Sequence, residues 1–105
     1  MKKSSKKLTL PDYQKLLKRL IKERGYHKET VPEVFMLLTE EVGELGKAIR
    51  KAGGMKTHAD SKIHDIEDEA ADVLWMLLDL CNRLGVNLEA AFAKKEAKNL
   101  KRERL

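Results

Sequence analysis

Residues 40–45 read Glu-Glu-Val-Gly-Glu-Leu, and residues 69–74 read Glu-Ala-Ala-Asp-Val-Leu. Each stretch carries two carboxylates three positions apart: Glu41 with Glu44, and Glu69 with Asp72. Side chains at this spacing project from nearly the same side of an α-helix. Each pair flanks an apolar strip, where an ionised carboxylate is costly to bury unless its charge is compensated. Two neighbouring antiparallel helices would therefore direct four acids towards one divalent cation.

The choice of ion follows from the side chains near these acids. The chain has one Cys and three His, and none of them is convincingly placed to join the acid pairs. A ligand set made only of oxygen favours Mg²⁺, with Mn²⁺ as the alternative, over zinc. A run of acids also marks many solvated helix faces. The apolar strips beside both pairs favour the metal site over that simpler interpretation.

Apolar residues recur at helical spacing in four segments, which we expect at 10–24, 31–52, 62–84 and 87–102. Thr9 and Thr30 each precede an acid by three positions, as in a capping box. The core stripe of the second helix is expected to consist of Val31, Phe35, Leu38, Val42, Leu45 and Ile49. The third helix is apolar nearly all round, so we expect a second subunit to cover it. The sequence therefore predicts an all-α fold that dimerises.

Length and charge narrow the functional classes. A chain of 105 residues with one Cys fits a single small domain without disulfides. We see no signal peptide and no apolar run of membrane-spanning length, and expect a soluble, cytoplasmic protein. Residues 1–28 carry ten basic and two acidic side chains, and residues 94–105 carry six basic and two acidic ones. Residues 29–93, between them, carry six basic and thirteen acidic side chains. This pattern suits a metal site with a polyanion nearby better than nucleic-acid binding. We expect a basic disordered tail at 1–8 and the helical domain at 9–105.

The motif Glu-Glu-x-x-Glu at 40–44, followed by Glu-x-x-Asp at 69–72, resembles the signature of MazG-like nucleotide pyrophosphohydrolases of the all-α NTP pyrophosphatase superfamily. The resemblance extends over nearly the whole chain. It implies a four-helix bundle that forms dimers or tetramers. It also implies hydrolysis of a nucleoside or deoxynucleoside triphosphate to the monophosphate and pyrophosphate.

The same resemblance assigns roles to the acids. Four of them would hold Mg²⁺: Glu41, Glu44, Glu69 and Asp72. Glu40 matches the first acid of the signature and would be the catalytic residue that orients or deprotonates the attacking water.

Three residues near the C-terminus, Lys95, Asn99 and Arg102, resemble the family's Lys-x-x-x-Asn-x-x-Arg pattern and would grip the substrate's phosphates. Their spacing places them on one side of a helix, where Arg suits bidentate contact and Lys supplies a point charge. A basic helix end also complements the helix dipole, which is the structural alternative. Tyr26 would stack on the base or pack half-buried, and Trp75 is assigned to a subunit interface in preference to a base pocket.

Other functional classes are weighed against this one. The main alternative is a non-catalytic helical dimer that binds nucleotide or a partner protein. A di-iron carboxylate protein ranks last, because such sites usually use Glu-x-x-His pairs and neither acid pair has His at that spacing. Base and sugar preference stay open at this stage.

Overall fold

The computed structural model describes residues 6–53 and 63–103, and the regular structure in these ranges is entirely helical. The four α-helices are α1 Leu10–Glu23, α2 Val31–Ala52, α3 Ile63–Arg83 and α4 Leu88–Glu103. A short 3₁₀ helix, η1 (Tyr26–Lys28), connects α1 to α2. The all-α prediction is confirmed for the described residues. The predicted helix ends agree with the structure to within one residue, except that the predicted start of the third helix at 62 lies outside the described residues. Of the expected tail at 1–8, residues 1–5 lie outside the described residues.

Both predicted capping boxes form. At the start of α1, the Asp12 amide donates to Thr9 Oγ1 at 3.3 Å, and the Thr9 amide donates to Asp12 Oδ2 at 3.0 Å. Thr30 and Glu33 make the same reciprocal pair at the start of α2, at 3.3 and 2.8 Å. A capping side chain contributes about 1 kcal/mol to helix stability. These caps explain why both helices begin where the sequence predicts.

Glycines end two helices by adopting a backbone that other residues avoid. Gly25, directly after the C-cap Arg24, has φ 79°, and Gly85, two residues after α3, has φ 69°. This left-handed region is accessible to glycine without a steric penalty. The turn at Gly25 directs the chain into η1 and then into α2.

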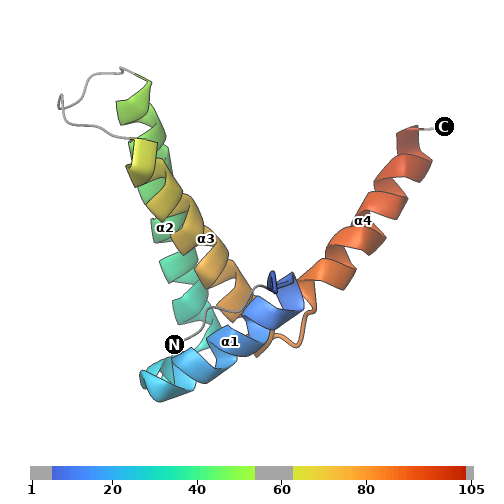
Figure 1. Ribbon diagram of the computed structural model, residues 1–105, viewed down its shortest axis with the longest axis horizontal. Coiled ribbons are helices and arrows are strands. Elements are labelled where there is room, and N and C mark those ends of the chain that lie inside the picture. Colours follow the sequence, from blue (N-terminus) through green and yellow to red (C-terminus); the bar gives the residue numbers. More distant parts are fainter. Residues whose placement is uncertain (1–5, 54–62, 104–105) are drawn as a thin grey trace.

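Helices α2 and α3 form an antiparallel hairpin, and α1 crosses the end of that hairpin where α2 begins (Figure 1). The core lies at this crossing, where Leu17 and Ile21 of α1 pack with Leu78 of α3. Helix α4 starts beside α1 and then projects away from the hairpin (Figure 1). One chain alone therefore does not close a compact four-helix bundle.

A polar clasp fixes α1 to the connection between α3 and α4. The buried Gln14 side chain donates to Asn82 Oδ1 at 2.9 Å and to the Val86 carbonyl at 2.8 Å. Its Oε1 accepts from the Leu88 amide at 3.1 Å. Because all three contacts join distant segments, this one side chain helps set where α4 leaves the core.

Half of the predicted core stripe of α2 is wrong for the single chain, while Val31, Leu38 and Leu45 are partly buried. Phe35, Val42 and Ile49 are each half exposed, at 53%, 50% and 53%. The face that packs on α3 is centred instead on Val34 and Ala48, which are 0% and 6% exposed. Both faces of α2 are apolar, and periodicity alone cannot say which of them meets α3. The flank expected to carry the acids is thus the one that faces the partner helix.

No helix in the two described ranges is long and apolar enough to span a membrane.

Candidate active site

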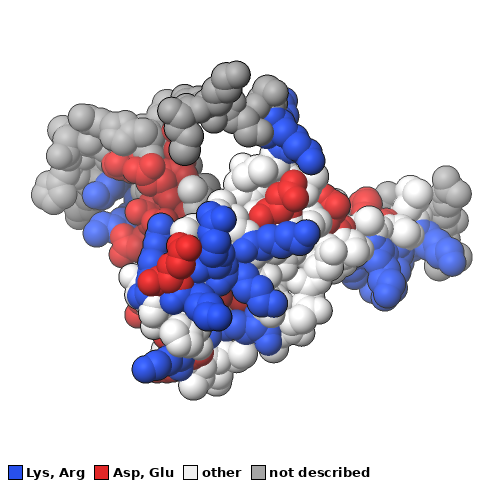
Figure 2. All heavy atoms as spheres, turned by 60° about the horizontal axis from the view of Figure 1, so that its bottom comes forward, with Lys and Arg blue, Asp and Glu red and all other residues white. Residues whose placement is uncertain are grey.

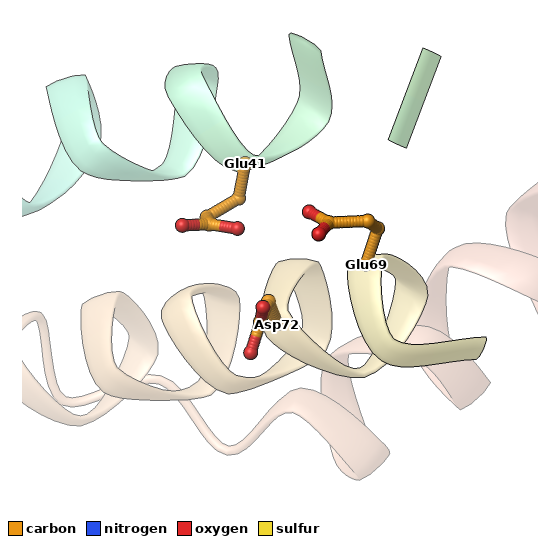
Figure 3. A group of neighbouring side chains, drawn as sticks. All are labelled: Glu41, Glu69 and Asp72. Carbon is orange, nitrogen blue, oxygen red and sulfur yellow. The ribbon is translucent and has the colours of Figure 1, made fainter. Parts of the chain in front are cut away.

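Three acids converge between α2 and α3. Each of Glu41, Glu69 and Asp72 contributes a carboxylate oxygen, and these oxygens lie within 4.8 Å of one another. Figure 3 shows Glu41 pointing from α2 towards the Glu69 and Asp72 side chains of α3. We call this group the acid cluster. Its formation follows from the helix period, since the two α3 acids lie one turn apart on the side that faces α2.

Burial and mutual repulsion perturb the acid cluster. The pKa of Glu41 is raised, first by burial and then by the negative charges of Asp72 and the other acids nearby. The pKa of Glu69 is raised for the same two reasons, with Asp72 and Glu44 the strongest neighbouring charges. Glu69 Oε2 is also buried without a hydrogen-bond partner among the described residues. A cation at the cluster would relieve both the repulsion and this unpaired oxygen.

Glu44 lies beside the cluster without joining its innermost group. Its charge acts on both Glu41 and Glu69. It lines a small hollow of about 100 Å³ that also includes Glu69 and Lys47. Glu40 is exposed and lies outside the innermost group, and its charge is the last of the causes that raise the pKa of Glu41. The structure therefore separates the predicted acids into three that converge, one adjacent and one peripheral.

A larger cavity opens from the other side of the acid cluster. It has a volume of about 310 Å³ and is lined by Arg24, Tyr26, Glu41, Asp72, Trp75 and Met76. We call it the aromatic cavity. Two acids, one cation and two aromatic rings thus border one space of the size that small ligands occupy.

The profile of the MazG nucleotide pyrophosphohydrolase domain matches residues 29–104, and that match spans most of the chain. The chain belongs to the MazG family. A search of curated proteins found no match. This family consists of nucleotide pyrophosphohydrolases, which agrees with the resemblance of the acid motifs.

The aromatic cavity of this MazG domain includes residues that the sequence analysis missed or placed elsewhere. Tyr26, expected near the base, does line it. Trp75 lines it too and also packs against the core, while its predicted place at a subunit interface stays a prediction. Trp75 and Met76 follow Asp72 by three and four positions, so helical spacing alone would have placed them on the acid-bearing side. Arg24 reaches the cavity through the packing of α1 against α3, which the sequence alone does not give.

The predicted phosphate-binding residues of the MazG domain lie elsewhere in the single chain. All three are on α4, which projects away from the hairpin (Figure 1). Lys95 and Arg102 are exposed, and Asn99 is half-buried and donates to Glu96 at 3.5 Å. None of the three lines either cavity at the acid cluster. One chain therefore brings together the acids and Tyr26 but not the basic residues of α4.

Proposed function

We propose that this MazG domain hydrolyses nucleoside or deoxynucleoside triphosphates between the α and β phosphates, releasing the monophosphate and pyrophosphate. The observation that best supports this function is the convergence of Glu41, Glu69 and Asp72 at the edge of the aromatic cavity. A triphosphate is a polyanion, and it could bind beside three carboxylates only if cations neutralised the charge between them.

The acid cluster fits Mg²⁺ by its chemistry. Its three ligands are carboxylates, one buried oxygen has no other partner among the described residues, and repulsion raises the pKa of two of the acids. We assign Glu41, Glu69 and Asp72 as direct ligands and Glu44 as an adjacent ligand, with Mn²⁺ able to replace Mg²⁺. When bound, the ion would neutralise phosphate charge and lower the pKa of a bound water.

The aromatic cavity accounts for the rest of the nucleotide. Tyr26 and Trp75 offer ring faces on which a base can stack. Arg24 provides a planar guanidinium suited to bidentate phosphate contact, on a wall shared with Glu41 and Asp72. We place the base between the rings and the triphosphate towards the acids.

Glu40 is proposed to act on water from outside the metal-binding group. It adjoins Glu41 in the chain and is exposed to solvent. A carboxylate in that position can accept a proton from an incoming water without being held by the ion.

A second copy of the chain is proposed to complete the site. The α2 stripe of Phe35, Val42 and Ile49 is half exposed, and Phe92 of α4 is 70% exposed. The radius of gyration is 16.9 Å, against about 13 Å for a compact domain of this length. Packing two such apolar surfaces together would bury them and give α4 a partner. Lys95, Asn99 and Arg102 of α4 would then meet the phosphates at an acid cluster.

Pyrophosphate release from a panel of nucleoside and deoxynucleoside triphosphates tests this function. We expect release with Mg²⁺, none with EDTA, and a large loss in Glu69→Gln. Glu67→Gln is the matched control, because Glu67 is exposed on the same helix and lies outside the acid cluster. If no triphosphate yields pyrophosphate with Mg²⁺ but nucleotides still bind, the chain is instead a non-catalytic nucleotide-binding protein.

A further inference from the structure

A second cavity lies at the crossing of α1 and α3, apart from the acid cluster. It has a volume of about 370 Å³ and takes its walls from α1, η1 and α3. The lining residues are Lys18, Ile21, Lys22, His27, Asp79, Asn82 and Arg83. None of them belongs to the acid cluster or to the aromatic cavity. We call this space the α1–α3 cavity.

Asp79 gives the α1–α3 cavity an unused acceptor. The residue is only 2% exposed. Its Oδ1 accepts from Arg83 Nε at 2.9 Å, whereas its Oδ2 is buried with no hydrogen-bond partner in the described part of the chain. An unpaired buried carboxylate oxygen is costly, and a donor that bound there would satisfy it.

The other buried polar groups in the wall are already occupied. Arg83 also donates to the carbonyls of Glu29 and Tyr26, so its guanidinium is held by η1 and the residue that follows it. Asn82 exchanges hydrogen bonds with Gln14 through both ends of its amide. Asp79 Oδ2 is therefore the buried acceptor in this wall that is left without a partner among the described residues.

The rim of the α1–α3 cavity is positively charged. Arg83 compensates Asp79, which leaves the ammonium groups of Lys18 and Lys22 without an ion-pair partner among the described residues. Both lysines are exposed on α1. Figure 2 shows that basic side chains gather on one face of the molecule. Two cations at one rim suit a phosphate monoester, which carries close to two negative charges at neutral pH, better than a single carboxylate.

We propose that the α1–α3 cavity binds a phosphate monoester that also carries a hydroxyl or amino donor, with a nucleoside monophosphate as the representative ligand. The phosphate contacts Lys18 and Lys22 at the rim, and the donor reaches Asp79 Oδ2 at the base. The volume lies at the lower end of the range for small-molecule sites, which fits one mononucleotide or a sugar phosphate.

The test is an NMR titration of the full chain in EDTA, so that divalent ions do not recruit nucleotide to the acid cluster. AMP and ribose 5-phosphate are the probes, with inorganic phosphate and adenosine as partial ligands. We expect shifts at the amides of His27 and Asn82. AMP should bind roughly tenfold or more tightly than phosphate or adenosine, and ribose 5-phosphate more tightly than phosphate, because each partial ligand makes only one of the two contacts.

Variants separate this site from the acid cluster. Lys18→Ala combined with Lys22→Ala should weaken AMP binding roughly tenfold or more, and Lys15→Ala, on the same helix but outside the cavity, should not. Asp79→Asn should also weaken it, with circular dichroism confirming that the fold is intact. The proposal is overturned if roughly 10 mM AMP leaves the cavity amides unmoved. Binding that is unchanged in the double lysine variant, or lost in Glu41→Gln instead, would equally overturn it.

Discussion

Replacing Glu41 by Gln removes the one acid that α2 contributes to the acid cluster, while keeping the size of the side chain. A ligand that binds only the folded state stabilises it by about 2.7 kcal/mol at a concentration 100 times its Kd. Each kcal/mol raises the Tm of a domain of this size by about 4–8 °C. Mg²⁺ at that concentration should therefore raise the Tm of the unaltered chain by roughly 10 °C or more.

Loss of one of three converging carboxylates should weaken Mg²⁺ binding roughly a hundredfold, because a charge-assisted contact disappears. The same Mg²⁺ concentration then equals the Kd and stabilises by only about 0.4 kcal/mol, a shift of roughly 2–3 °C. In EDTA the order of the two Tm values should reverse. Glu41→Gln should have a higher Tm than the unaltered chain because repulsion within the acid cluster is reduced.

Calorimetric melts with EDTA and with Mg²⁺ measure both effects, with Glu67→Gln as the control that should behave like the unaltered chain. A full Mg²⁺ shift in Glu41→Gln, or no Mg²⁺ shift in the unaltered chain, would refute the reasoning.

Three further predictions follow from other contacts. In EDTA the free energy of unfolding should fall as pH rises from 4.5, the ordinary glutamate value, through the raised pKa values of Glu41 and Glu69. In this pH range the folded state keeps protons on Glu41 and Glu69 that the unfolded state releases. Saturating Mg²⁺ should remove this loss of stability, and urea unfolding at several pH values measures both effects. Gln14→Leu should destabilise the fold by about 3 kcal/mol because it leaves three polar groups unpaired, and Lys15→Leu should change urea unfolding little. Glu40→Gln should lower kcat yet keep the Mg²⁺-induced Tm shift, and loss of that shift would make Glu40 a metal ligand instead.

The helices, and the convergence of three of the four predicted metal ligands, could be predicted from the sequence because both depend on local rules. Thr9 and Thr30 form the capping boxes that their spacing indicates. Glu69 and Asp72 share one side of α3 because the helix period requires it. Helix ends and same-face pairs involve few residues, so short patterns are sufficient to predict them.

Features that depend on how the helices pack against one another could not be predicted from the sequence. The exposed stripe around Val42 was taken for the core because periodicity identifies an apolar face without identifying its partner. Asp79 carried no motif, and its burial follows from the way α1 and η1 cover α3. Arg24 reaches the aromatic cavity because of the way α1 packs on α3. The direction of α4 likewise depends on the Gln14 clasp, which joins residues far apart in the chain.

The central claim is that Glu41, Glu69 and Asp72 together hold a divalent ion next to the substrate's phosphates. Anomalous diffraction from crystals grown with Mn²⁺ and a non-hydrolysable triphosphate analogue measures this directly. The account predicts a manganese peak between the three carboxylates, with the analogue's phosphates beside it and its base in the aromatic cavity. An ordered analogue with no metal peak at these carboxylates would contradict it.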